Sequence, residues 1–125
     1  MKTIRQHYFI KATPEEVFSA LTNPFTIELW SGYPAQMEAR EGTEFSLFDG
    51  DISGRNIKIV ENTQLVQEWF FGDSPEESIV TIDIKPHQLG TKILLQHTNV
   101  PDDDADEFTQ GWNEYYFGAI QEFFK

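Results

Sequence analysis

Apolar and polar side chains alternate at the start of the chain. Within residues 3–11, Ile4, Tyr8 and Ile10 fall on one face and Arg5 falls on the other. A period of two is typical of a β-strand that buries one side and leaves the other in water. The pattern therefore predicts a first strand over residues 3–11, with Ile4, Tyr8 and Ile10 facing the core.

Two short helices are predicted after this strand. Thr13 is suited to an N-cap and Pro14 to the first helical position, and Glu16 completes the Thr-x-x-Glu spacing of a capping box. Asn23-Pro24 ends this helix, because the residue before a proline is displaced from helical backbone angles. Residues 25–30 then predict a second short helix.

Beyond these helices the apolar positions follow strand spacing. Six short runs rich in β-branched and aromatic residues are separated by turn signals such as Glu41-Gly42, Asp49-Gly50-Asp51 and Asp73-Ser74-Pro75. Short connections of this kind join consecutive strands into antiparallel hairpins. The six predicted strands cover residues 35–40, 43–48, 54–61, 65–71, 78–85 and 91–98.

The last part of the chain predicts a long amphipathic helix. Pro101 stops the preceding strand, and Asp104 with Glu107 has the spacing of a second capping box. Apolar residues then recur every three or four positions, which places a broad aromatic stripe on one side of the helix. The members of this stripe are Ala105, Phe108, Trp112, Tyr115, Tyr116, Ala119 and Phe123.

This order of elements predicts one α+β domain over residues 1–125. A curved antiparallel sheet of about six to seven strands wraps around the long C-terminal helix, and two short helices follow the first strand. With 125 residues, of which 39% are hydrophobic, the chain can build one core but not two.

Two residues fall on the flank of the last helix that points away from the stripe. The spacing predicts that Phe117, near Phe124, is at least partly exposed, and both are candidates for contact with a partner protein. Single exposed aromatic residues also occur without a function, so this alternative stays open. Gly111 and Gly118 lie seven residues apart, and because glycine costs a helix about 1 kcal/mol relative to alanine, we expect the backbone of a strand or of a partner to approach them closely.

Composition excludes several classes of partner. The chain carries a net charge of −12, so a phosphate backbone would be repelled and nucleic acid is not expected as a partner. It contains no cysteine, which rules out disulfides and thiolate chemistry. Its apolar stretches are too short for a signal peptide or a membrane span. We therefore expect a cytoplasmic protein that makes no contact with a membrane.

Motifs for catalysis and metal binding are weak. The sequence contains no nucleophile elbow, phosphate-binding loop or dinucleotide fingerprint, so we expect no catalytic residues, no cofactor and no enzymatic activity. His7, His87 and His97 have no partner at metal-ligand spacing. Residues 49–54 match half of a calcium loop, but Val60 stands where such a loop needs a bidentate glutamate. A tight hairpin turn is the preferred interpretation, and no metal site is predicted.

Three segments together resemble a known family. They are residues 37–54, the strand Leu65-Val-Gln-Glu-Trp69, and Val100-Pro101 followed by Gln110-Gly-Trp-Asn-Glu-Tyr-Tyr-Phe117. Over nearly its whole length the chain resembles the C-terminal domain of the activator of heat-shock protein 90 ATPase, a member of the helix-grip superfamily of START domains and the birch-pollen allergen. The resemblance implies a helix-grip fold, a co-chaperone-like role and a heat-shock protein 90 class chaperone as partner. In that family a further N-terminal domain supplies the main chaperone contact, so little ATPase stimulation is expected from this domain alone.

The same superfamily often binds a ligand between sheet and helix, which implies an alternative function as a START-like carrier of a small hydrophobic ligand. Aromatic residues in this region either fill the core or form the wall of a cavity. His97 shares strand parity with Ile93 and Leu95, which points it at the core as a hydrogen-bonded histidine or as a polar group of the cavity. The cavity candidates are Trp30, Phe45, Trp69, Ile93, Leu95, His97, Phe108, Trp112 and Tyr116. The sequence leaves the oligomeric state open.

Overall fold

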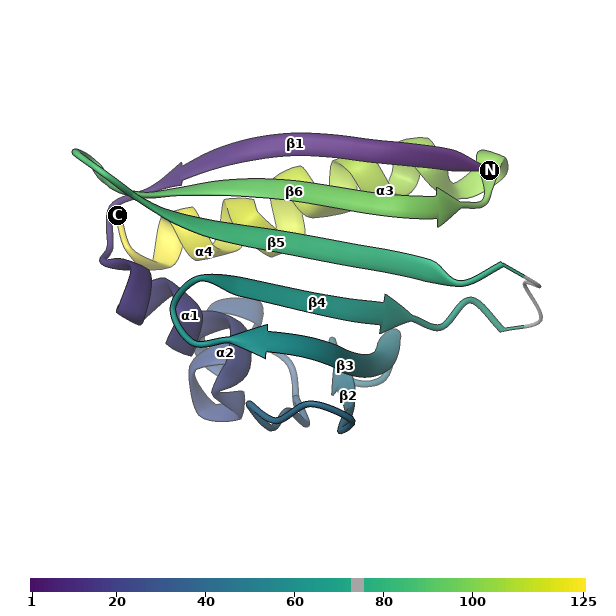
Figure 1. The fold of residues 1–125 in the computed structure, drawn as a ribbon, viewed down its shortest axis with the longest axis horizontal. Coiled ribbons are helices and arrows are strands. Elements are labelled where there is room, and N and C mark those ends of the chain that lie inside the picture. Colours follow the sequence, from purple (N-terminus) through teal and green to yellow (C-terminus); the bar gives the residue numbers. More distant parts are fainter. Residues whose placement is uncertain (73–75) are drawn as a thin grey trace.

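The computed structural model describes residues 1–72 and 76–125, and the predicted order of strand, two helices, strands and long helix is confirmed (Figure 1). The predicted turn at Asp73-Ser74-Pro75 lies outside the described residues. The strands are β1 (Lys2–Ile10), β2 (Glu44–Leu47), β3 (Ile52–Val60), β4 (Gln64–Trp69), β5 (Ser78–His87) and β6 (Gly90–Val100). The helices are α1 (Pro14–Thr22), α2 (Pro24–Ser31), the 3-10 turn η1 (Asp102–Asp104), α3 (Ala105–Gly111), the π-helical stretch η2 (Trp112–Tyr116) and α4 (Phe117–Phe123).

In the described part of the chain the sheet has six strands in the order β1-β6-β5-β4-β3-β2, and every neighbouring pair is antiparallel. Strands β2 to β6 form a meander, and β1 pairs with β6 at the far edge. Ile4, Tyr8 and Ile10 of β1 are buried on one face, as their spacing predicts. The fold is therefore of the α+β helix-grip class.

The strand predicted over residues 35–40 is wrong. Within the described residues this segment forms a single bridge, in which the backbones of Gln36 and Ser46 exchange two hydrogen bonds of 2.8 and 2.9 Å. The segment then leaves the sheet, and the Glu38 carbonyl oxygen accepts a hydrogen bond of 3.0 Å from the side-chain amide of Asn56. Because a side chain takes the place of a neighbouring strand, the ladder does not continue.

The helices lie on one face of the sheet (Figure 1). The C-terminal helical segment runs beside β1 and β6, and α1 and α2 lie toward β3 and β4. The predicted capping box of α1 is confirmed: the Thr13 hydroxyl accepts from the Glu16 N–H at 3.1 Å, and the Glu16 carboxylate accepts from the Thr13 N–H at 3.0 Å. The Asn23 side chain caps α2 by accepting a hydrogen bond of 2.9 Å from the Phe25 N–H.

The C-terminal helix changes its register at η2. The Phe117 N–H donates to the Trp112 carbonyl, five residues back rather than four. Each residue of an α-helix advances about 100°, so one additional residue moves the buried stripe by one position from there on. Phe117 and Ile120 are fully buried, whereas Tyr115 and Phe123, predicted in the stripe, are 64% and 41% exposed. The prediction that Phe117 is exposed is therefore wrong.

The two glycines of this helix have different surroundings. At Gly118 a methyl group would overlap the Asn113 carbonyl oxygen, because η2 brings that oxygen close to the next turn. At Gly111, whose φ is −60°, no atom of the described residues lies within 4 Å of an added methyl group, apart from its chain neighbours and the surrounding helix backbone. The expected close approach of a strand is wrong for both glycines, because the helix itself supplies the contact at Gly118 and no strand of the described residues reaches Gly111. The approach of a partner stays a prediction.

These surroundings predict opposite effects of the same substitution. Gly111→Ala should raise the free energy of unfolding by about 0.5 to 1 kcal/mol, because alanine costs the helix less backbone entropy and has room here. Gly118→Ala should lower it by about 1 to 3 kcal/mol, the usual cost of a steric overlap in a packed site. Urea unfolding of both variants, followed by circular dichroism, measures the difference. Equal shifts in the two midpoints would show that η2 does not form.

The capping box predicted at Asp104 is also wrong. Asp104 has φ −102° and ψ −9° instead of extended angles, and its side chain makes no capping hydrogen bond with the described residues. The helical segment begins one turn earlier with η1. The Asp102 carboxylate there lies 2.7 Å from the amino group of Met1, whose hydrogen bond and charge lower the pKa of Asp102. The pairing of Lys2 with Val100 brings these two groups together.

Candidate functional site

Two stacked tryptophans hold the C-terminal helix on the sheet. The rings of Trp69 on β4 and Trp112 on η2 have centroids 4.8 Å apart at an interplanar angle of 26°. The ring of Tyr116 lies 4.5 Å from that of Trp112. All three side chains are buried. Stacked aromatic pairs contribute roughly 0.5 to 1.5 kcal/mol beyond their burial, so this cluster stabilises the contact between helix and sheet.

His97 on β6 connects the tryptophan pair to the next strand. The indole N–H of Trp112 donates to His97 Nδ1 at 3.1 Å, and His97 Nε2 lies 2.8 Å from Ser78 Oγ. Because an indole N–H can only donate, Nδ1 is the acceptor and the ring proton is on Nε2. Nε2–H then donates to Ser78 Oγ, and the Ser78 hydroxyl donates to the Thr98 carbonyl at 2.9 Å. Burial lowers the pKa of His97 to about 4, which keeps the ring neutral at pH 7.

A serine and a histidine at this distance can form a nucleophile and its base, but here the proton is on the wrong atom. A general base must accept the hydroxyl proton, and His97 Nε2 already carries one. Ser78 is 1% exposed and His97 is fully buried. The predicted hydrogen-bonded core histidine is confirmed, and the geometry favours a structural role for both residues.

A second buried chain of hydrogen bonds begins at Trp69. Its indole N–H donates to Gln67 Oε1 at 3.0 Å, and Gln67 Nε2 donates to Asn56 Oδ1 at 2.9 Å. The Asn56 amide continues to the Glu38 carbonyl. Among the described residues, no buried side-chain nitrogen or oxygen lacks a hydrogen-bond partner. Both indole N–H groups are thus engaged within the protein.

An open cleft of about 730 Å³ borders the tryptophan pair. Its base is formed by Trp69, Trp112 and Tyr116, one wall by the C-terminal helix, and the other by the end of α2 and the β2–β3 turn. This volume falls in the range of roughly 300 to 1,000 Å³ found for small-molecule sites. Other hollows of about 650 and 620 Å³ are more open to solvent. The cleft is lined by Ser31, Tyr33, Phe48, Asp51, Ile52, Trp69, Glu107, Phe108, Gln110, Gly111, Trp112, Glu114, Tyr115, Tyr116 and Ala119.

The structure places some of the nine predicted cavity residues on the wall of the cleft and the others in the packed core. Those that line the cleft are Trp69, Phe108, Trp112 and Tyr116. Those that lie in the packed core are Trp30, Phe45, Ile93, Leu95 and His97. Trp30 donates its N–H to the Ala20 carbonyl at 2.7 Å, and the ring of Phe45 packs against Gly54. The sequence pattern identifies buried positions, but it does not distinguish the interior from the edge of a cleft.

Sequence reasoning missed the wall opposite the helix. Tyr33 follows Gly32, the left-handed C-cap of α2, and Phe48 has φ 53° in the turn after β2. The ring centroid of Phe48 lies 6.2 Å from that of Tyr33 and 6.4 Å from that of Tyr116. At both positions the sequence places an aromatic residue beside a turn signal, which is the one local feature that could have indicated this wall. Only the fold places these two turns beside the C-terminal helix.

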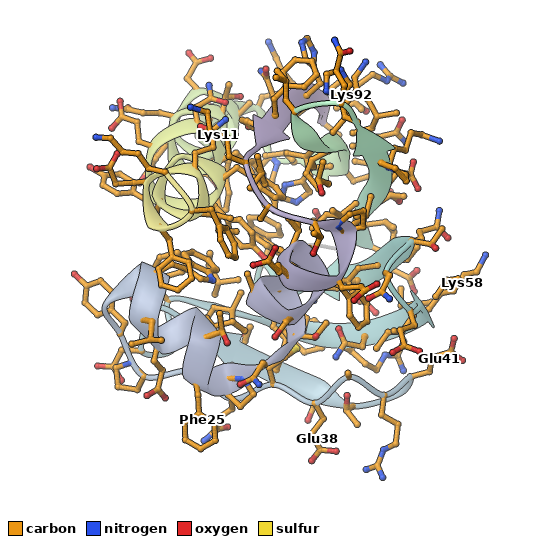
Figure 2. All side chains as sticks on the ribbon, turned by 90° about the vertical axis from the view of Figure 1, so that its left-hand side faces the viewer. Lys11, Phe25, Glu38, Glu41, Lys58 and Lys92 are labelled. Carbon is orange, nitrogen blue, oxygen red and sulfur yellow. The ribbon has the colours of Figure 1, made fainter. Side chains whose placement is uncertain are left out.

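The two predicted partner-contact residues are covered to different extents. Phe117 is fully buried and stacks on Tyr8, with ring centroids 4.7 Å apart, so it offers no surface to a partner. Phe124 is half-buried against the core. Among the described residues, the two most exposed large apolar side chains lie elsewhere: Phe25 and Leu29, four residues apart on α2, are 79% and 71% exposed. Figure 2 shows Phe25 projecting away from the body of the molecule.

Negative charge is concentrated in the helical segments. Residues 12–39 and 93–124, which include all the described helices, contain eleven Asp and Glu residues and no Lys or Arg. Lys2, Lys58, Lys85 and Lys92 lie on the strands, as Figure 2 shows for Lys58 and Lys92, whereas Lys11 follows β1 and Lys125 follows α4. The helical layer therefore presents an acidic surface that contains the exposed apolar residues of α2.

Other predicted features are simpler. Residues 48–51 connect β2 to β3 as a tight hairpin, with Leu47 opposite Ile52, which confirms the turn predicted within residues 49–54. Among residues 1–72 and 76–125, no three His, Asp or Glu side chains gather as metal ligands would. The helices of the same residues are too short or too polar to cross a bilayer.

Fold and site together define an α+β helix-grip protein with an aromatic cleft beside its C-terminal helix. The family described as Activator of Hsp90 ATPase homolog 1-like protein matches residues 11–125. The chain belongs to this family, which confirms the resemblance drawn from its segments.

Relatives of known name show how far the similarity extends. The human activator of 90 kDa heat shock protein ATPase homolog 1 is 28% identical over 114 residues, which cover 90% of this chain and 34% of that protein. This chain thus spans about a third of the length of the curated relatives it matches. The crystal structure of an HSP90 activator from Plasmodium falciparum is 26% identical with a TM-score of 0.83, covering 98% of this chain and 94% of that one. The Aha1 dimer from Colwellia psychrerythraea, at 18% identity and a TM-score of 0.85, covers 99% and 96% and shares the fold.

Proposed function

We propose that this protein is a co-chaperone-like interaction module that binds a heat-shock protein 90 class chaperone. The observation that carries the proposal is the family match, together with the likeness to a Plasmodium falciparum chain of similar extent whose structure bears the name HSP90 activator. The proposal includes a cytoplasmic site of action and a function that depends on binding rather than catalysis. The hydrogen-bonded Ser78 and His97 support the second point, because their proton is not placed for nucleophilic attack.

The proposed contact surface is the acidic helical layer around α2. Phe25 and Leu29 would supply apolar contacts at its centre, since large exposed side chains on one helix face are typical of interaction sites. Surrounding carboxylates would attract a basic surface on the chaperone and speed the encounter. Residues buried in the core, such as Phe117, take no direct part.

Binding through one domain should be weak. A single module lacks the effective-concentration gain of a linked pair, which can reach 10² to 10⁴-fold. We therefore expect a dissociation constant in the micromolar range or weaker, a loss of affinity with added salt, and little ATPase stimulation by the domain alone.

Titration of the labelled domain with the chaperone from the same organism at low salt tests the proposal. Phe25→Ala combined with Leu29→Ala should weaken binding by ~10-fold, because both side chains are largely exposed and their loss removes contact area without disturbing the core. Leu89→Ala, at 59% exposure on the connection between β5 and β6, is the matched control and should leave affinity unchanged. An absence of binding at about 100 μM, a free energy of association weaker than roughly −5.5 kcal/mol, would contradict the proposal.

A second candidate function is supported by the cleft. We propose it as a site for a small ligand, because its size and aromatic lining are those of small-molecule sites and it is open to solvent. The two functions use different parts of the helical layer, so a cleft-filling variant separates them. Such a variant would no longer bind the ligand but would still bind the chaperone.

A further inference from the structure

The polar groups around the cleft have one sign of charge. Asp51 approaches from the β2–β3 turn, and Glu107 and Glu114 approach from the C-terminal helix. In the described part of the chain, no Lys, Arg or His lines this cleft. All three residues line the cleft and are exposed to solvent. A ligand carrying its own carboxylate would therefore meet like charges and no cation to pair with.

The base of the cleft strengthens this preference. The indole N–H groups of Trp69 and Trp112 are used by Gln67 and His97, so they are not available to a ligand anion. Burial raises the pKa of the Tyr116 hydroxyl, which therefore stays neutral. The ring surface that the cleft presents belongs to the exposed Tyr33 and Tyr115 and to the partly exposed Phe48 and Phe108, and aromatic rings attract cations through their negative faces.

We propose that the cleft binds an organic cation, a molecule with a flat aromatic or aliphatic body and a protonated amine. The body would pack against the exposed rings of Tyr33 and Tyr115, and the ammonium group would lie near Asp51 and Glu114. The proposal rests on the second proposed function, ligand binding in the cleft. A single lysine or arginine side chain from a partner protein would leave most of about 730 Å³ unfilled, so the volume favours a separate small molecule.

Three probes with the same ring and different charge test the proposal. They are 2-naphthylmethylamine, 2-naphthylmethanol and 2-naphthoate, titrated at low salt while the indole N–H signals of Trp69 and Trp112 are followed by NMR. We expect the amine to bind ~10-fold more tightly than the alcohol, with the carboxylate weakest, and added salt to reduce the difference. Carboxylate binding as tight as amine binding would overturn the cation preference and leave the ligand site itself in place. No binding of any probe would overturn both.

Matched variants test which residues cause the preference for the amine over the alcohol. Glu114→Gln and Asp51→Asn should each reduce the preference for the amine over the alcohol, whereas Glu61→Gln makes the same change in net charge outside the cleft and should not. Gly111→Leu should abolish binding of all probes, because position 111 lines the cleft and has room for a side chain in the helix. The same variant should still bind the chaperone. A loss of probe binding alone would therefore concern the cleft, whereas a loss of chaperone binding would concern the proposed interaction module. Unchanged probe binding by Gly111→Leu would place the ligand elsewhere and refute the proposal.

Discussion

Replacing Trp112 with alanine should lower the free energy of unfolding by about 3 to 5 kcal/mol, the usual cost of truncating a buried aromatic side chain. Trp112 is 2% exposed and stacks on Trp69 and, with centroids 5.8 Å apart, on Phe117. The substitution also removes the hydrogen bond to His97 Nδ1 and leaves a buried acceptor without a donor, which adds to the loss. Urea unfolding followed by far-ultraviolet circular dichroism measures the change.

Two further variants separate the contributions. Trp112→Phe keeps a ring in the stack but removes the N–H, so it should cost about 1 to 3 kcal/mol, the range for a buried polar group left unsatisfied. Tyr115→Ala removes a neighbouring aromatic side chain that is 64% exposed, and its effect should stay within about 0.5 kcal/mol. If Trp112→Ala left the midpoint unmoved, the C-terminal helix would not be part of the core.

Acidification from pH 6.5 to pH 4 should cost about 3 kcal/mol of stability through His97 alone. Burial lowers its pKa from 6.5 to about 4 in the folded protein. Well above pH 6.5 both states are unprotonated at this site, so His97 contributes no pH dependence there. Between pH 6.5 and pH 4 the unfolded chain binds a proton that the folded protein excludes, and stability falls as pH falls. Below about pH 4 both states are protonated and this contribution levels off.

The measurement compares stability curves, because the 21 Asp and Glu residues also titrate in acid. His97→Gln removes the titrating group and retains a side chain that can accept from Trp112, so its stability should change less between pH 6.5 and pH 4 than that of the parent. His7→Gln, at an exposed position, should follow the parent curve. Parallel curves for the parent and His97→Gln would show that His97 is not held neutral by burial.

Local sequence signals predicted the elements whose cause is local. The capping box of Thr13 and Glu16 needs only four consecutive residues, and it begins α1 as predicted. The alternation of Ile4, Tyr8 and Ile10 buries one face of β1, because a strand repeats every two residues whatever lies beside it. Turn residues separate the strands, and five of the predicted six runs after α2 form the meander.

The errors occur where distant segments compete with a local pattern. Residues 35–40 have strand spacing, but the side chain of Asn56 takes the hydrogen bond that a ladder would need. Asp104 and Glu107 have capping-box spacing, but η1 starts the helical segment earlier, where the pairing of β1 with β6 brings Met1 to Asp102. In both cases the local preference is worth about 1 kcal/mol, which a few tertiary contacts exceed.

By itself, the sequence determined the class of fold, the order of its elements and the family, because periodicity, capping and short motifs are properties of neighbouring residues. Only the tertiary structure decided the register of the C-terminal helix, where η2 leaves the predicted core residue Tyr115 exposed and buries Phe117 instead. It also decided which aromatic residues line the cleft and on which nitrogen His97 carries its proton. These features depend on packing between residues far apart in the chain, and a helical wheel drawn at a constant angle per residue cannot anticipate a turn that accommodates one residue more.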